Sequence, residues 1–352
     1  MKILVLNAGS SSLKCWYHEV AESTLDGPAP HPLWQEQIDW TVPGNIDAVL
    51  RAVPGGVDAV GHRVVHGGRF HESTLLTPDV RAAIAEETSI APAHNQLVLA
   101  AMDSVERILG SGTKQVAVFD TAFHASLAPA AYVYPGPYAW VADGIRRYGF
   151  HGISHGYAAR RAAQLLEKDP AALPSLRLVT CHLGSGASLA AVRGGVSIDT
   201  TMGFTPLDGL MMGSRSGSID PGILTHLIRR HGYTADQLDE ILYRQSGLLG
   251  ISGISADMRE ILAAIERGDP RARLAFDLYT HRLVREIGSM IAVLGGADAL
   301  VFTGGVGENC AALRAAVMPQ LAFLPGLRVL VIHAEEEWEI ARQCRAIISA
   351  ER

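Results

Sequence analysis

The sequence predicts an α/β protein built from two similar halves. Apolar, strand-like runs alternate with helical patterns and glycine turns along the chain, as in βαβ units. One plan, an apolar strand, a small Gly/Ser turn and a second apolar strand, occurs twice: as MKILVLNAGSSSLKCWYH at residues 1–18 and as LRLVTCHLGSGASLAAVRG at residues 176–194. This repeat predicts duplicated domains that face each other across a cleft, with chance similarity between two hairpins as the alternative.

Size and composition restrict the class of protein. The chain has 352 residues, enough for two ordinary domains, of which 48% are hydrophobic and 19% charged. A net charge of −6 argues against nucleic acid and anionic membranes as partners. The ILVL run near the N-terminus is too short for a signal segment or a membrane span. The four cysteines lack zinc-site or CxxC spacing, so we expect buried, reduced thiols in a cytoplasmic protein.

The first half alternates strands and helices. Residues 57–65 (VDAVGHRVV) and 116–119 (VAVF) are predicted to be buried strands that end in polar residues. Residues 78–90 and 96–109 have helical patterns. The proline-containing stretch SLAPAAYVYPGPYAW, residues 126–140, is predicted to be a loop that crosses between the two domains.

The second half repeats this alternation after its hairpin. Four helices are expected, at residues 221–231, 235–245, 256–267 and 271–293. The segment ADALVFTGGVGEN, residues 297–309, is predicted to be a strand that runs into a glycine loop and a helix. Residues 327–332 (LRVLVI) are predicted to be a last buried strand, and residues 335–350 a closing amphipathic helix.

The small polar residues of NAGSSSLK, residues 7–14, would pack poorly in a hydrophobic core and are better suited to binding an anion. Backbone N–H groups and hydroxyls in such a turn can surround a phosphate. Asn7 would then offer a carbonyl to a hydrated Mg²⁺, and Lys14 a positive charge to a phosphate. A serine-rich hairpin alone is weak evidence, but two such turns together with TGGVGEN indicate a nucleotide. The chain has neither a Walker GxxxxGK[ST] loop nor a GxGxxG fingerprint, which argues against P-loop and Rossmann chemistry.

Residues 199–222 (DTTMGFTPLDGLMMGSRSGSIDPG) have little helix or strand character. Long irregular stretches within compact domains are usually functional. Arg215 lies between glycines there, where a guanidinium suits a carboxylate or a transferring phosphoryl group. An arginine on a solvated loop is the alternative.

Arg63 and Asp120 lie at the carboxyl ends of predicted strands, where open α/β sheets place ligands. Asp120 suits a base, a group that orients a nucleophile, or a ligand of metal-bound water. The alternative is a carboxylate that only caps the next turn.

Two histidine pairs are spaced by four residues, His62 with His66 and His151 with His155. We disfavour zinc, because neither pair has the Glu of HExxH and both are flanked by glycines. We expect His151 instead to donate a hydrogen bond to a charged transition state. The acidic run 335–337 is expected to be an exposed helix start, with one member able to reach a metal.

Taken together, nine motifs resemble the acetate kinase family of the acetate and sugar kinase/Hsp70/actin superfamily. In order they are NAGSSSLK, GHRVVHGG, APAHN, FDTAFH, RRYGFHGISH, HLGSGAS, DTTMGFTPLDGLMMGSRSGSIDP, SGLLGISGISADMR and FTGGVGEN. The resemblance covers nearly the whole chain. It implies a duplicated RNase H-like (actin-like ATPase) fold of two domains around a central cleft, and usually a homodimer. It also implies a Mg²⁺- and ATP-dependent kinase that converts a short carboxylate into an acyl phosphate and ADP, reversibly.

The resemblance also implies domain boundaries and site residues. The N-terminal domain would span residues 1–125 and be completed by the helix at 337–352, with residues 126–336 forming the nucleotide-binding domain. The metal ligands would be Asn7 and Glu336, and the catalytic residues Asp120, His151 and Arg215. Substrate contacts would be Arg63 and His94, with an acyl pocket of Val65, Ala93, Phe150 and Pro206. Nucleotide contacts would be Lys14, His182, Leu183, Gly184, Ser185, Gly186, Asp257, Met258, Arg259, Gly305, Val306, Gly307, Glu308 and Asn309.

Five positions depart from the family pattern. Gln96 stands where the family usually has Pro, and Arg69 where it usually has Glu. Ser185 and Ser218 stand where the family usually has Asn and Asp, respectively. Ala93 stands where it has Leu, so we expect extra room in the acyl pocket and use of propionate at least as well as acetate. Two alternatives remain open: a kinase of the same fold that uses another small carboxylate or pyrophosphate, and a non-catalytic nucleotide-binding sensor.

Overall fold

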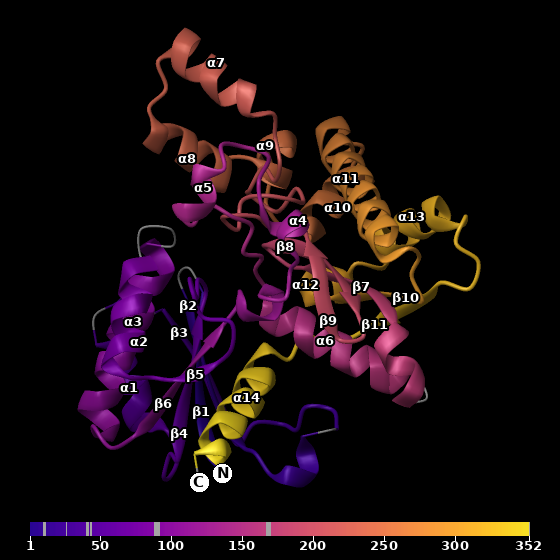
Figure 1. Cartoon of the computed structure of the whole chain (residues 1–352). Coiled ribbons are helices and arrows are strands. Elements are labelled where there is room, and N and C mark those ends of the chain that lie inside the picture. Colours follow the sequence, from indigo (N-terminus) through magenta and orange to yellow (C-terminus); the bar gives the residue numbers. More distant parts are fainter. Residues whose placement is uncertain are drawn as a thin grey trace. The chain divides into compact units, whose positions relative to one another are not determined.

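Figure 1 shows the computed structural model of the chain. It describes all residues except 10, 11, 26, 40, 41, 43, 88–91, 167–169 and 352, and for 92–94, 170 and 171 it describes the backbone alone. The chain divides into two compact units. Unit 1 comprises Met1–Ala125, Phe150–Tyr157 and Glu335–Arg352; unit 2 comprises Ser126–Gly149 and Ala158–Ala334. Unit 1 therefore includes residues 150–157, which the sequence interpretation assigned to the second domain.

Unit 1 contains a six-stranded sheet in the order β3-β2-β1-β4-β6-β5. The first three strands form an antiparallel meander, and β4 and β6 join β1 in parallel. The short β5 pairs antiparallel with the edge of β6. The strands are β1 (Lys2–Ala8), β2 (Ser12–Glu19), β3 (Trp34–Asp39), β4 (Ala59–Val64), β5 (Thr74–Leu75) and β6 (Lys114–Phe119).

Helices contact the sheet of unit 1 from sequence-distant parts of the chain. The main core joins the sheet to α1 and α3 and includes Leu6, Cys15 and Met102. The C-terminal helix α14 packs on β1, β4 and β6 (Figure 1). A Cβ at Gly61 of β4 would lie 2.8 Å from the Ile340 side chain, so glycine permits this close packing. The helices are η1 (Glu22–Thr24), α1 (Asn45–Ala52), α2 (Pro78–Glu86), α3 (Pro92–Leu109), η3 (Ala122–His124) and α14 (Glu336–Ala350).

Unit 2 repeats the strand plan of unit 1. Its sheet has the order β11-β10-β7-β8-β9, again an antiparallel meander of the first three strands with two parallel strands added to the first. The shared order confirms the predicted duplication. The strands are β7 (Arg177–Leu183), β8 (Ala187–Arg193), β9 (Val196–Thr200), β10 (Ala299–Thr303) and β11 (Arg328–Val331).

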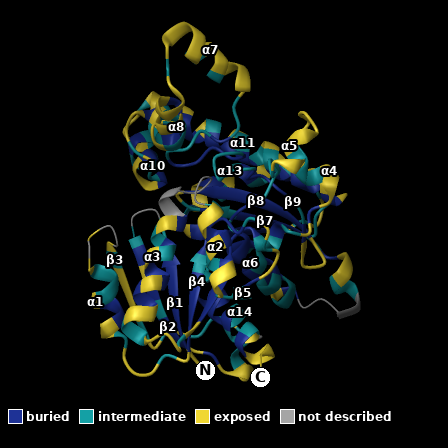
Figure 2. Ribbon diagram, turned by 60° about the vertical axis from the view of Figure 1, so that its left-hand side comes forward, coloured by how far each residue is buried: buried dark blue, intermediate teal, exposed yellow. Residues whose placement is uncertain are grey.

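The long helix α11 (Pro270–Leu294) packs on β7, β8 and β9 and is the main cover of this second sheet. Helix α7 (Pro221–His231) has no buried residue (Figure 2). Helix α6 (Gly152–Leu165) starts in unit 1 and continues into unit 2. The remaining helices are α4 (Pro129–Tyr132), α5 (Ala139–Ala142), η4 (Pro170–Ser175), α8 (Ala235–Arg244), α9 (Gly247–Ser252), α10 (Met258–Glu266), α12 (Gly304–Asn309), α13 (Ala311–Val317) and η5 (Met318–Leu321).

The predicted strands and helices are present with small shifts at their ends, but four predictions are wrong. Residues 126–140, predicted to be a loop, contain helix α4 and the start of α5. Residues 304–309 form helix α12 directly after β10, without an intervening glycine loop. The strand at 328–331 is mostly exposed, because β11 lies at the edge of its sheet. The acidic run at the start of α14 is not exposed: Glu336 and Glu337 are 13% and 5% exposed. Part of the predicted helix 78–90, residues 88–90, lies outside the described residues.

Among the helices that the structure describes, none combines the length and hydropathy that crossing a membrane requires.

His18 provides a stability prediction for unit 1. It is fully buried between Trp16 and Trp338, with ring centroids 5.8 and 5.5 Å away, and neither ring nitrogen has a hydrogen-bond partner in the described part of the chain. Burial lowers the pKa of His18 from 6.5 to about 4. The unfolded chain therefore binds this proton first, and the stability contribution of neutral His18 is lost as pH falls from 6.5 towards 4.

We expect His18→Phe to fold and to reduce the loss of unfolding free energy between pH 7 and pH 5 by about 2 kcal/mol. Urea unfolding followed by tryptophan fluorescence at both pH values measures this. His31→Phe, at an exposed position, is the control. An unchanged pH dependence in His18→Phe would show that this ring does not set the acid sensitivity.

Candidate active site

The ends of two neighbouring parallel strands carry a buried ion pair. Arg63 lies near the end of β4, and Asp120 directly follows β6. Arg63 Nε and Nη2 both donate to Asp120 Oδ2, at 3.0 and 2.5 Å. The Asp120 side chain is 1% exposed and that of Arg63 15%. These two residues, singled out from their places at strand ends, therefore form one ion pair.

Asn7 and Glu336 extend this pair into a cluster. Asn7 Oδ1 accepts a hydrogen bond from Arg63 Nη1 at 3.1 Å, and Asn7 Nδ2 donates to Glu336 Oε2 at 3.3 Å. Arg63 Nη1 also lies 4.0 Å from Glu336 Oε2. Asn7 and Glu336 are 329 residues apart in sequence and meet because α14 packs against β1.

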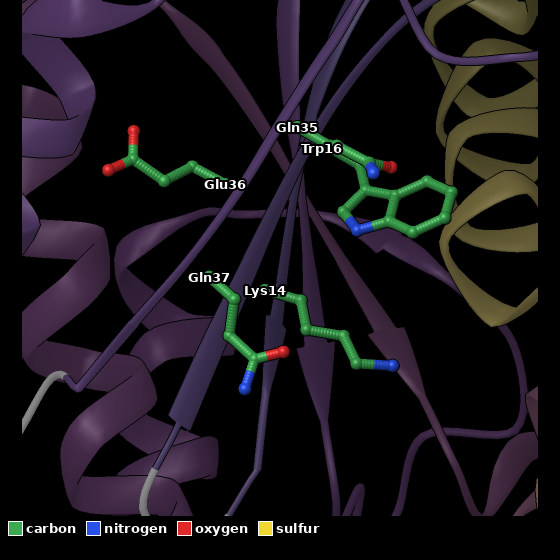
Figure 3. Close-up of a pocket in the computed structure, with 5 residues that line it drawn as sticks. All are labelled: Lys14, Trp16, Gln35, Glu36 and Gln37. Atoms are coloured by element: carbon green, nitrogen blue, oxygen red, sulfur yellow. The ribbon is translucent and has the colours of Figure 1, made fainter.

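Lys14 and Glu337 lie beside this cluster. Glu337 Oε1 accepts from Asn7 Nδ2 at 2.9 Å and lies 3.1 Å from Lys14 Nζ. Figure 3 shows Lys14 with Trp16, Gln35, Glu36 and Gln37 around a hollow on β2 and β3. Lys14 is 47% exposed, so its ammonium combines an ion pair with access to solvent.

The surroundings of the cluster determine its charge states. Burial alone would lower the pKa of Arg63, but the Asp120 and Glu336 carboxylates raise it above its usual range, so the guanidinium stays charged. Burial raises the pKa of Asp120, and Arg63 opposes that rise. Asp120 Oδ1 is buried and has no hydrogen-bond partner among the described residues. A buried carboxylate oxygen in this state calls for a further donor or a cation.

His151 precedes α6 with a left-handed backbone. Its φ is 56°, and no other non-glycine residue in the described ranges has a positive φ. Gly152 donates its N–H to the Asp120 carbonyl at 2.8 Å, and a Cβ at Gly152 would lie only 2.2 Å from that oxygen. Glycine at 152 thus permits α6 to start against the residue that follows β6. His151 is the residue directly before this contact with the Asp120 backbone. Such backbone strain is common at functional sites.

Three of the four predicted acyl-pocket residues lie in unit 1, and the side chains of two of them, Val65 and Phe150, are described. They are 6% and 1% exposed. His124 Nε2 donates to the Phe150 carbonyl at 3.1 Å, and the Phe150 and His66 ring centroids are 5.8 Å apart. These contacts fix the backbone just before His151. The predicted substrate contacts Ala93 and His94 lie outside the described side chains.

Arg215 and Pro206 lie in unit 2, in a segment from residue 201 to 220 that contains no helix or strand, as predicted. Arg215 Nη1 donates to the Pro206 carbonyl at 3.1 Å. The guanidinium carbon lies 5.9 Å from the centroid of the Tyr243 ring. The predicted phosphoryl-stabilising arginine and the fourth acyl-pocket residue are therefore direct neighbours.

Buried and half-buried polar contacts hold this irregular segment in place. Arg147 Nη1 donates to the carbonyls of Thr200, Thr201 and Met202, at 3.1, 2.9 and 2.8 Å. Ser218 Oγ donates to Asp208 Oδ1 at 2.6 Å and accepts from the Gly209 N–H at 2.9 Å. The segment replaces the hydrogen bonds of regular structure with side-chain to backbone bonds.

The predicted nucleotide contacts of unit 2 lie in three segments. Residues 182–186 comprise the end of β7 and the turn to β8, which is closed by a 2.8 Å bond from Gly184 N to Gly186 O. Asp257 caps α10, accepting from Arg259 N at 2.8 Å, and pairs with the exposed Arg259 side chain. Met258 is the first residue of α10, and residues 305–309 belong to α12.

Glu308 of α12 is engaged within the protein. Its Oε1 accepts from Gly304 N and from Ala334 N, both at 2.9 Å, and its Oε2 contacts His333 Nδ1. The carboxylate therefore anchors the chain that leads into α14. A nucleotide contact through Glu308 stays a prediction.

The sequence reasoning missed Glu337 as a partner of Asn7 and Lys14 beside the cluster. It expected an exposed acidic run of which one member, assigned as Glu336, reaches a metal, whereas the neighbouring Glu337 is buried against Asn7 and Lys14. The amphipathic pattern of the closing helix was the available signal, because it places one of the acids on the side that faces the sheet.

Comparisons with known proteins agree on one family. A family model described as the acetokinase family matches residues 45–351. An acetate kinase of Gloeobacter violaceus is 50% identical over 98% of both chains. The crystal structure of Porphyromonas gingivalis acetate kinase superposes with a TM-score of 0.86, at 36% identity over 99% of both chains. A propionate kinase from Francisella tularensis also superposes with a TM-score of 0.86, at 33% identity over 98% of this chain and 99% of that chain.

Proposed function

The chain belongs to the acetokinase family, and on this basis we propose that it transfers the γ-phosphoryl group of ATP to acetate or propionate, reversibly, to give an acyl phosphate and ADP. The observation that carries this function is the full-length match at 50% identity to an acetate kinase. The cluster of Asn7, Arg63, Asp120 and Glu336 in unit 1 supports it independently, because it combines a buried guanidinium with oxygen ligands.

Arg63 is the group we assign to the substrate carboxylate. A guanidinium has five N–H donors, and Nε, Nη1 and Nη2 each use one on Asp120 or Asn7, which leaves two for a ligand. Two parallel donors suit a carboxylate. Asp120 holds the guanidinium in a fixed orientation. The substrate is already ionised, so Asp120 need not act as a strong base.

The residues present fit a magnesium ion. Within the described ranges, no three His, Cys, Asp or Glu side chains form a metal cluster by themselves. Mg²⁺ in nucleotide sites usually takes one or two protein oxygens and completes its shell with phosphates and water. Asn7 and Glu336 supply such oxygens, and the buried, unpartnered Asp120 Oδ1 can accept from a metal-bound water. Bound Mg²⁺ would neutralise charge that develops on the phosphoryl oxygens.

Arg215 and His151 would stabilise the transferring phosphoryl group, with Lys14 and the three segments of unit 2 contacting ATP or ADP. Charge stabilisation and positioning carry most of the catalysis in phosphoryl transfer. Arg147 and Ser218 bond to the irregular segment that carries Arg215 and so hold its backbone in place. A fixed backbone supports this role, because Arg215 has to be positioned to stabilise charge.

We further place the protein in the cytoplasm as a homodimer. The four cysteines are free and buried, which suits a reducing compartment. Helix α7 exposes Ile223 and Ile228, at 45% and 47%, and has no buried residue, so it offers an apolar face for a second copy. No nucleic acid or membrane partner is proposed.

The first test of the function is a hydroxamate assay for acyl phosphate. We expect product with Mg·ATP and acids of two and three carbons, and no product when pyrophosphate replaces ATP. Product formed only with pyrophosphate, or no product with any acid, would contradict the proposal and favour one of the two alternatives.

Arg215→Ala should keep the fold and lower kcat by about 10³–10⁵, because an arginine that stabilises a phosphoryl transition state is worth that much. Arg244→Ala, at an exposed arginine of α8, is the matched control and should retain activity. Circular dichroism confirms folding of both variants. A folded Arg215→Ala protein with unchanged kcat would remove Arg215 from the mechanism.

The acyl pocket predicts substrate choice. We expect kcat/KM for propionate to equal or exceed that for acetate, and Ala93→Leu to lower the propionate-to-acetate ratio by about tenfold or more, since one methylene is worth ~1–3 kcal/mol in a hydrophobic pocket. Steady-state kinetics with both acids measures the ratio. A wild-type enzyme that strongly prefers acetate would refute this.

The homodimer is tested by light scattering after size-exclusion chromatography. We expect the mass of a dimer, twice the 37.6 kDa of the chain, and a shift towards monomer in the Ile223→Lys, Ile228→Lys double variant. A wild-type monomer contradicts the dimer, and a variant that stays dimeric moves the interface away from α7.

A further inference from the structure

Glu337 is a buried carboxylate that no role in the predicted site explains. It lies in the first turn of α14 and its side chain is 5% exposed. A carboxylate near a helix N-terminus gains from the helix dipole, but that gain does not require burial. Burying a carboxylate is costly unless it is paired and hydrogen-bonded. The contacts of Glu337 therefore have to offset its desolvation.

Those contacts are with two residues of the first hairpin. Asn7 and Lys14 face each other as partners in the antiparallel pairing of β1 with β2. Glu337 Oε1 accepts from Asn7 Nδ2 at 2.9 Å and lies 3.1 Å from Lys14 Nζ. A single carboxylate oxygen thus joins the two sides of the hairpin to α14.

The contact with Asn7 fixes which end of its amide faces the site. Carboxylates only accept hydrogen bonds and a guanidinium only donates them. Nδ2 therefore faces the two glutamates, and Oδ1 faces Arg63 Nη1 at 3.1 Å. The Glu337 bond is the shorter of the two bonds from Nδ2, at 2.9 Å against 3.3 Å for Glu336. Without Glu337, the amide would lose its better-placed acceptor.

Adjacent glutamates therefore have different surroundings. Glu336 lies 4.0 Å from Arg63 and holds Asn7 weakly, whereas Glu337 is more buried and holds Asn7 and Lys14. We propose that Glu337 is a positioning residue that keeps the Asn7 carbonyl oxygen aimed at the metal and substrate side and keeps Lys14 placed for a phosphate. This rests on the proposed function, which assigns Asn7 and Glu336 to Mg²⁺.

The test compares Glu337→Ala and Glu337→Gln with Glu339→Ala. Gln keeps an oxygen that accepts from Asn7 Nδ2, whereas Ala removes it. Glu339 is a matched control, because it is a buried carboxylate on the same helix, 3% exposed, that accepts from Arg342 and Gln343. Removing a group that orients a metal ligand typically costs about 10–100-fold in metal affinity or activity.

We expect Glu337→Ala to raise the Mg²⁺ concentration for half-maximal activity and to lower kcat, each by about tenfold or more. Glu337→Gln should restore the Mg²⁺ dependence to within about threefold, and Glu339→Ala should leave both quantities unchanged while it lowers the unfolding temperature. In an Asn7→Ala background, Glu337→Ala should have little further effect on the Mg²⁺ dependence. Wild-type values in Glu337→Ala, or equal losses in the Ala and Gln variants, would overturn the positioning role.

A second measurement needs no turnover. Calorimetry measures the Kd for ADP without metal and the Kd for Mg·ADP. We expect the ratio of the first Kd to the second to be lower than wild type in Glu337→Ala and equal to wild type in Glu337→Gln and Glu339→Ala. A wild-type protein that forms no acyl phosphate would contradict the proposed kinase function, whereas an unchanged ratio in Glu337→Ala would contradict the positioning role alone.

Discussion

The ion pair between Arg63 and Asp120 is the interaction around which the candidate site of unit 1 is arranged. Its members come from neighbouring parallel strands, and both are largely removed from water. Breaking a buried pair on one side costs about 3–5 kcal/mol, because an uncompensated charge remains. The pairing with Asp120 therefore holds Arg63 in place. Asn7 and Glu336 both lie against its guanidinium. The guanidinium therefore stays charged and oriented among these oxygen atoms.

The duplicated sheet explains where the site residues come from. In each unit the first strand is central, with the meander on one side and two parallel strands on the other, so polar residues at the parallel strand ends meet beside the first hairpin. The two units differ in their helices: α11 covers β7, β8 and β9 in unit 2, whereas α14, from the far end of the chain, packs on the sheet of unit 1. This return of the C-terminus supplies the acidic residues that Arg63 and Lys14 require.

Local patterns in the sequence predicted most of the fold, and the motifs predicted the residues of the cluster. Apolar runs located β4 and β6 because those strands are almost wholly buried, and a helical pattern located α7 although that helix has no buried residue. The same rule failed for 327–332, where an apolar run forms an exposed edge strand. Asn7 and Glu336 could be named from a resemblance, but their contact depends on the docking of α14. The buried state of Glu337 depends on the same docking, and the signal for it lies in the amphipathic pattern of the whole closing helix, not in the acidic run alone.

The two serines that depart from the family pattern are accommodated by specific contacts. Ser218 Oγ both donates to Asp208 and accepts from the Gly209 N–H, so it closes the irregular segment with a neutral group. An aspartate there would place a second carboxylate against Asp208. Ser185 contacts the same segment through its backbone, since its carbonyl accepts from Gly213 N at 3.2 Å. A backbone contact does not depend on the side chain, so the placement of the segment that carries Arg215 is compatible with serine at both positions.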